Sequence, residues 1–134
     1  MDKKIISYIL GLVITLGIGH AYVATAEDSI ISTAAGLAVM PAAALYALFG
    51  FFNWKEFKKK AYVNLMLHVA TYLLVTGSFL VHAVFVAEFV NGQLIFEEGW
   101  YGVLISMPLF WGIGLISHTL YAWSKRGFED VCLD

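Results

Sequence analysis

The four histidines of this 134-residue chain are its residues best suited to chemistry. Their positions place them at two depths of a helical bundle, His20 level with His82 and His68 level with His118. Histidine is a common axial ligand of haem iron, and helical bundles often hold such cofactors between side chains of facing helices. The pairing therefore predicts a protein that binds two b-type haems, each through two histidines.

The composition indicates what surrounds these histidines. Hydrophobic residues make up 60% of the chain, charged residues make up 13%, and the mean hydropathy is +0.79. This is too apolar for an ordinary soluble domain. A helix of about 20 apolar residues crosses a hydrocarbon core of roughly 30 Å. Four stretches meet this length, and they are Ile5–Ala26, Ile30–Phe52, Ala61–Phe89 and Tyr101–Trp123. We expect one all-α integral membrane domain over residues 1–134, an up-down-up-down bundle of four helices.

The charged residues predict the orientation of this bundle. All eight basic residues fall on one side of the four stretches, and five acidic residues lie in the turns on the other side. Lys and Arg near helix ends are retained in the cytoplasm, so both termini are expected there. The small net charge of −2 and the juxtamembrane lysines fit lipid headgroups and not nucleic acid. The basic residues are Lys3, Lys4, Lys55, Lys58, Lys59, Lys60, Lys125 and Arg126.

Counting from the cytoplasmic boundary places one histidine pair. His68 lies eight residues after Lys60, and His118 lies seven residues before Lys125. At 1.5 Å per residue, each histidine lies roughly 10–12 Å inside the membrane. We expect the two imidazoles to be level and to hold one haem.

Counting from the external boundary places the other pair. His82 lies six residues before Glu88, and His20 lies seven residues before Glu27, so both lie roughly 9–11 Å deep. His68 and His82 are 14 residues apart, which puts them about 21 Å apart along the helix axis and within roughly 40° of each other around it. Two haems on this helix would span much of the bilayer.

Small and apolar side chains near the histidines fit a flat macrocycle. Gly17 precedes His20 by three residues and Gly114 precedes His118 by four, so each glycine lies one turn from a proposed ligand. Three further side chains are expected on the shared face of His68 and His82, between the two rings, and they are Tyr72, Val75 and Phe79.

Histidines 14 residues apart on one helix, with partners at matched depth on other helices, resemble the arrangement in diheme membrane b-type cytochromes. The resemblance implies an electron-transfer protein that moves electrons across or within the membrane. It also implies a quinone or a redox protein as partner, with the chain serving as a subunit of a larger oxidoreductase. No C-x-x-C-H motif is present, so the haems would be held without covalent attachment.

A second resemblance covers about Lys58–Trp123. The segments His68–Tyr72 (H-V-A-T-Y) and Trp111–His118 (W-G-I-G-L-I-S-H) are similar to a small family of two-transmembrane-helix domains, found alone or attached to bacterial regulatory proteins. The family's usual Asn is Thr76 here, and its W-P-x-x-G-W stretch reads M-P-L-F-W over Met107–Trp111. The family's two histidines fall on His68 and His118. The resemblance implies the cytoplasmic membrane of a prokaryote.

The competing hypothesis is a non-redox membrane module, either an assembly subunit or a regulatory sensor. Its histidines would be interhelical hydrogen-bonding groups or pH-responsive groups. Other metals are less suited to these positions. Two histidines are an incomplete zinc site, and no Met or Cys is placed to complete a copper site. The lone Cys132 provides neither a disulfide nor a thiolate cluster.

Overall fold

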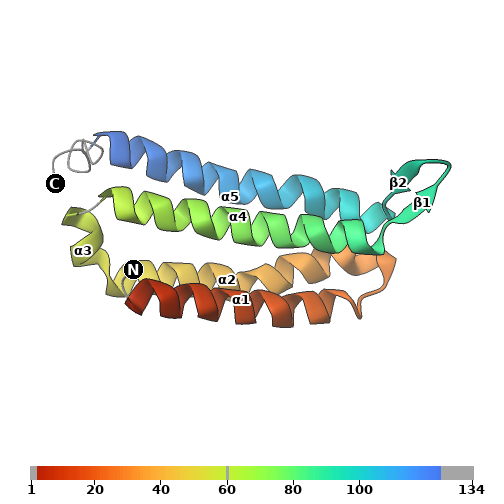
Figure 1. The fold of residues 1–134 in the computed structure, drawn as a ribbon, viewed down its shortest axis with the longest axis horizontal. Coiled ribbons are helices and arrows are strands. Elements are labelled where there is room, and N and C mark those ends of the chain that lie inside the picture. Colours follow the sequence, from red (N-terminus) through yellow and green to blue (C-terminus); the bar gives the residue numbers. More distant parts are fainter. Residues whose placement is uncertain (1–2, 60, 125–134) are drawn as a thin grey trace.

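The computed structural model describes residues 3–59 and 61–124. Four long helices dominate it, α1 (Lys3–Val23), α2 (Ile31–Phe52), α4 (Ala61–Val86) and α5 (Glu98–Ser124). Successive long helices run in opposite directions, so the start of α1 and the end of α5 lie at the same end of the bundle (Figure 1). All four are long and apolar enough to span a membrane. The predicted all-α bundle of four membrane helices is confirmed.

The bundle is built from two pairs of helices. α1 packs mainly on α2, and α4 packs mainly on α5, so we call them the N-terminal pair and the C-terminal pair. Figure 1 shows the pairs as two layers. Small side chains bring α1 and α2 together, since a Cβ added to Gly19 would lie 3.1 Å from the carbonyl oxygen of Ala38. Close approach over small residues is a general way in which membrane helices associate.

The side chains inside the bundle are apolar, and so are most of those on its outside. Leu12, Val75 and Phe79 are buried in the core, whereas Phe85 and Phe110 are largely exposed on the outer faces. A soluble monomer rarely exposes apolar surface on this scale. Helices that are hydrophobic on every side fit a lipid environment. The structure therefore describes a multi-pass membrane protein.

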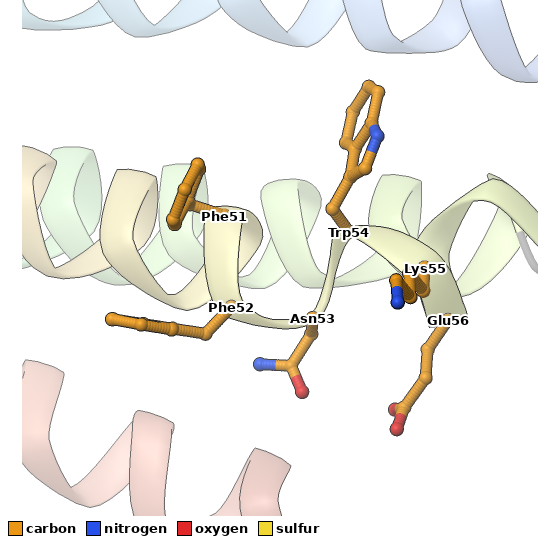
Figure 2. Close-up of a pocket in the computed structure, with 6 residues that line it drawn as sticks. All are labelled: Phe51, Phe52, Asn53, Trp54, Lys55 and Glu56. Carbon is orange, nitrogen blue, oxygen red and sulfur yellow. The ribbon is translucent and has the colours of Figure 1, made fainter.

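A short helix, α3 (Trp54–Lys59), joins the two pairs at the end that carries Lys4 and Lys55, which we call the basic end. Asn53 ends α2, and both its backbone N–H and its side-chain amide donate to the carbonyl of Phe49, at 3.1 and 2.8 Å. Figure 2 shows Asn53 and Glu56 pointing toward α1, where Lys4 forms an ion pair with Glu56 at 2.8 Å. The residues from Phe51 to Glu56, where α2 ends and α3 begins, line an open pocket of about 770 Å³. α3 lies outside the four stretches predicted to be helical.

At the opposite end, which we call the acidic end, three predicted boundaries were wrong by three residues each. The helix expected to reach Ala26 ends at Val23, the helix expected to reach Phe89 ends at Val86, and the helix expected to begin at Tyr101 begins at Glu98. A 3-10 turn (Asp28–Ile30) follows α1, and a hairpin of β1 (Glu88–Val90) and β2 (Gln93–Ile95) follows α4. Asn91 and Gly92 form the turn of this hairpin, and their φ angles of 50° and 82° are those of a tight hairpin turn.

Candidate functional site

The structure brings together both histidine pairs that depth counting selects. His68 and His82 lie on α4, at opposite ends of the bundle. The His68 and His118 rings have centroids 4.6 Å apart, and the His20 and His82 rings have centroids 5.0 Å apart. The first pair lies within the C-terminal pair of helices, whereas the second joins α1 to α4 across the seam between the pairs.

The pair nearer the basic end belongs to a hydrogen-bonded network, which we call the His68 network. Nδ1 of His68 lies 2.9 Å from the hydroxyl of Tyr46, and Nε2 lies 3.4 Å from the carbonyl oxygen of Trp111. Nε2 of His118 lies 3.4 Å from the same hydroxyl, and Nδ1 lies 3.2 Å from the amide nitrogen of Asn64. All four ring nitrogens therefore have a partner.

The chemistry of these partners gives the network one direction when both imidazoles are neutral. The carbonyl of Trp111 only accepts, so Nε2 of His68 carries the proton and its Nδ1 accepts from the Tyr46 hydroxyl. The Tyr46 oxygen then accepts from Nε2–H of His118, whose Nδ1 accepts from the Asn64 amide. Each imidazole N–H then has an acceptor and each unprotonated ring nitrogen has a donor, as a stable polar cluster in an apolar interior requires. The Tyr46 hydroxyl also lies 3.5 Å from Oδ1 of Asn64.

The His68 network connects three helices at one point. Asn64 and His68 lie on α4, Trp111 and His118 lie on α5, and Tyr46 reaches them from α2 across the seam. The His68 side chain is only 4% exposed. Tyr46 also stands edge-on to the His68 ring, with centroids 4.9 Å apart and an interplanar angle of 86°. A single tyrosine thus attaches the N-terminal pair to His68 and His118 of the C-terminal pair.

A second polar contact crosses the seam next to this network. The Thr71 hydroxyl donates to the carbonyl of Leu67 at 2.8 Å, so the Tyr8 hydroxyl is the donor in its 2.7 Å bond to Thr71. Tyr8 and Thr71 are both buried, and they join α1 to α4. α4 supplies His68, Thr71 and His82 to these contacts, whereas near the acidic end the Ser32 hydroxyl of α2 donates to the carbonyl of Gly99 on α5 at 2.6 Å.

The pair nearer the acidic end is simpler. Nδ1 of His20 lies 3.0 Å from Nδ1 of His82, so one ring donates and the other accepts. Phe79 lies against the His20 ring at a centroid distance of 4.5 Å, and Trp100 lies against the His82 ring at 4.8 Å. Nε2 of His20 is buried and has no hydrogen-bond partner within the described part of the chain. This atom is the unsatisfied polar group of the pair.

An open groove of about 630 Å³ runs beside His20 and His82. Much of its wall comes from α4, including Gly77 and Phe85. A Cβ added to Gly77 would meet nothing within 4 Å. The same is true of Gly17 on α1, so the small residue expected next to His20 does leave open space.

The space expected beside the other pair is filled. A Cβ added to Gly114 would lie 3.0 Å from Cε1 and 3.2 Å from Nε2 of His68, so the imidazole itself occupies the gap over this glycine. Two metal–imidazole bonds of about 2 Å each would set the ligating nitrogens about 4 Å apart, with the macrocycle between the rings. The packing of His68 on α5, and the four satisfied ring nitrogens, leave no such slot. A haem does not fit between His68 and His118 in this arrangement.

The side chains expected between two stacked haems have other neighbours. Val75 and Phe79 are buried in the core, and Phe79 packs against His20. Tyr72 lies next to Gly112 on α5. These residues pack the interface around α4 and do not border a stack of two ring-shaped cavities.

Four polar residues of the seam were not predicted as site residues, although depth counting could have found two of them. Tyr46 lies seven residues before Asn53, which puts it at about the depth of His68. Asn64 lies one turn before His68. For the other two, Tyr8 and Thr71, the only signal in the sequence is that each is a polar residue within an apolar stretch.

Residues 3–59 and 61–124 contain no group of three or more His, Cys, Asp or Glu side chains that could hold a metal ion. Lys60, Lys125, Arg126 and Cys132 lie outside the described residues. Comparisons with protein family models, with curated proteins and with solved structures found no match to this chain. The resemblances to b-type cytochromes and to two-helix membrane domains therefore stay predictions.

Proposed function

We propose that this protein is a non-redox membrane module of the assembly or sensing kind, which acts through the relative position of its two helix pairs. The observation that carries this proposal is the His68 network. Its histidines use all four ring nitrogens in bonds within the protein, and its central hydroxyl comes from the opposite pair of helices. Histidines used in this way fix how helices dock in a membrane.

The arrangement of the seam supports the same proposal. Polar contacts from α4 reach Tyr46 on α2 and both Tyr8 and His20 on α1. Each of these contacts ties one pair of helices to the other in surroundings where an unpaired polar group is costly. A signal or a partner protein that shifted one pair would have to break or rearrange these bonds. The seam is thus the part of the molecule that a regulatory input would act upon.

A second candidate function is electron transfer through one b-type haem held by His20 and His82, whose rings would have to leave their 3.0 Å contact to admit the macrocycle. Two observations favour it, the unpartnered Nε2 of His20 and the open groove beside both rings. When bound, the haem would supply one-electron chemistry, with a quinone or a redox protein as partner. The chain's own contribution would be the two imidazoles and the aromatic walls provided by Phe79 and Trp100.

A reduced-minus-oxidised absorption spectrum of the protein, purified after expression with ample haem, separates these functions. Haem per chain should be quantified on the same sample. A colourless protein supports the non-redox module. One haem per chain that is lost in His20→Ala and kept in His118→Ala supports the second candidate. Haem that is lost in His118→Ala and kept in His20→Ala would contradict both.

A further inference from the structure

The β1–β2 hairpin at the acidic end exposes apolar side chains that the bundle does not cover. Phe89 is 74% exposed, and Leu94, its directly paired neighbour on the other strand, is 48% exposed. Directly paired residues of an antiparallel ladder lie on the same face, so Phe89 and Leu94 form one apolar surface. We call this surface the Phe89 face.

The opposite face of the hairpin has a different composition. Side chains alternate between the two faces along each strand, so Glu88 and Val90 lie together across from Ile95 and Gln93. This face therefore pairs a carboxylate with an apolar residue, and an apolar residue with an amide. The hairpin is amphipathic, with one wholly apolar face and one mixed face.

The base of the hairpin fixes its height relative to the membrane. β1 begins two residues after α4 ends, and only Phe96 and Glu97 separate β2 from the start of α5. Phe96 packs edge-on against Tyr101 in the first turn of α5, with ring centroids 6.1 Å apart. Tyr101 is itself half exposed on the outer surface of the bundle. Aromatic rings in this position are typical of the boundary between lipid and water.

We infer that the hairpin lies along the membrane surface, with the Phe89 face in contact with lipid at the level of the headgroups and the first part of the acyl chains. Three observations favour lipid as the occupant. The hairpin joins the ends of two membrane-spanning helices whose outer faces are apolar, and Phe85 near the end of α4 is 84% exposed. The hairpin leans away from the bundle axis in Figure 1. Its polar side chains are confined to the opposite face, where water can reach them.

The tight turn keeps the two faces of the hairpin distinct. Asn91 and Gly92 both have positive φ, which gives the two-residue turn that keeps the strands paired and their side chains in register. An isolated two-stranded hairpin is only marginally stable in water. Lipid contact along the Phe89 face would replace the packing partner that an isolated hairpin lacks. Glu88 at the base stays at the polar boundary, so the insertion is shallow.

Spin labels on the full-length protein in phosphatidylcholine nanodiscs test this inference. Leu94→Cys and Gln93→Cys, each in a Cys132→Ser background, place labels on adjacent residues that face opposite ways. Accessibility to oxygen, which partitions into lipid, should exceed accessibility to a water-soluble nickel chelate at residue 94. At residue 93, accessibility to the nickel chelate should exceed accessibility to oxygen. Phe89→Cys, which retains Leu94, should repeat the result for residue 94.

Two outcomes would overturn the inference. Equal, water-like accessibility at residues 93 and 94 would mean that the hairpin stands in solvent. Low accessibility to both reagents at residue 94, with dipolar broadening between labels, would mean that a second copy of the chain covers the Phe89 face. Gly92→Val guards against a local effect of the label, because it forces a β-branched residue into φ of +82° and disrupts the turn. It should remove the difference between residues 93 and 94.

Discussion

The hydroxyl of Tyr46 lies 2.9 Å from Nδ1 of His68 and joins α2 to α4. The same oxygen lies 3.4 Å from Nε2 of His118, so one tyrosine contacts both His68 and His118. Removing only the Tyr46 hydroxyl should therefore break the hydrogen bonds of the His68 network and leave the packing of the helices unchanged.

Tyr46→Phe should lower the stability of the folded protein in a bilayer by about 0.6 to 1.7 kcal/mol, which are the average and the largest value typical of interhelical hydrogen bonds in membranes. The ring stays in place, so the loss reports on the hydroxyl alone. Steric trapping or SDS unfolding would measure it. Tyr72→Phe is the matched control, because the Tyr72 hydroxyl makes no hydrogen bond within the described residues. An equal loss in both variants would contradict the prediction.

The direction of the His68 network predicts the proton positions on two imidazoles. At neutral pH, His68 and His118 should both carry their proton on Nε2, which ¹⁵N spectra of histidine-labelled protein in bilayers can show. A variant with His20→Gln and His82→Gln leaves only these two signals. In Tyr46→Phe, His68 should keep its Nε2 proton because Trp111 still accepts it, whereas His118 should become a mixture of tautomers. An Nδ1 proton on His68 in the unaltered network would refute this assignment.

Two glycines predict opposite responses to the same substitution. Gly114→Ala places a methyl group 3.0 Å from the His68 ring and should destabilise the protein by about 1 to 3 kcal/mol, as overpacking does. Gly17→Ala meets nothing within 4 Å and should be neutral or stabilise α1 by up to about 1 kcal/mol. Thermal unfolding in the same lipid compares them. If both variants are neutral, the close packing of His68 on α5 is wrong.

The ion pair between Lys4 and Glu56 should contribute little. Both side chains are more than half exposed, so Glu56→Gln should change stability by less than about 1 kcal/mol. The effect should shrink further as salt is raised from 0.01 to about 0.15 M, since exposed charges are screened. Unfolding at the two salt concentrations would test this. A large effect that does not depend on salt would mean that α3 is held more tightly than this geometry implies.

The sequence predicted the four spans because apolar length is a direct consequence of membrane thickness. It also predicted the histidine pairs, since depth depends only on the rise per residue. It did not predict that Tyr46 would contact both His68 and His118, because that contact depends on which helices are neighbours and on side-chain conformation. The same limit explains the hairpin. Glu88 is the one charged residue between the apolar stretch of α4 and Phe89, and a single charge near a helix end does not distinguish a longer helix from a strand.

Because α4 holds the partners of Tyr8, His20 and Tyr46, the order of synthesis has a consequence for assembly. Chains are made from the N-terminus, so α1 and α2 enter the bilayer before α4 exists. Until the third span arrives, two phenol groups and one imidazole must remain among lipid tails or find temporary partners. A chain stopped after α2 would therefore lack the partners of all three groups, and the N-terminal pair of helices reaches its final packing only when α4 is in place.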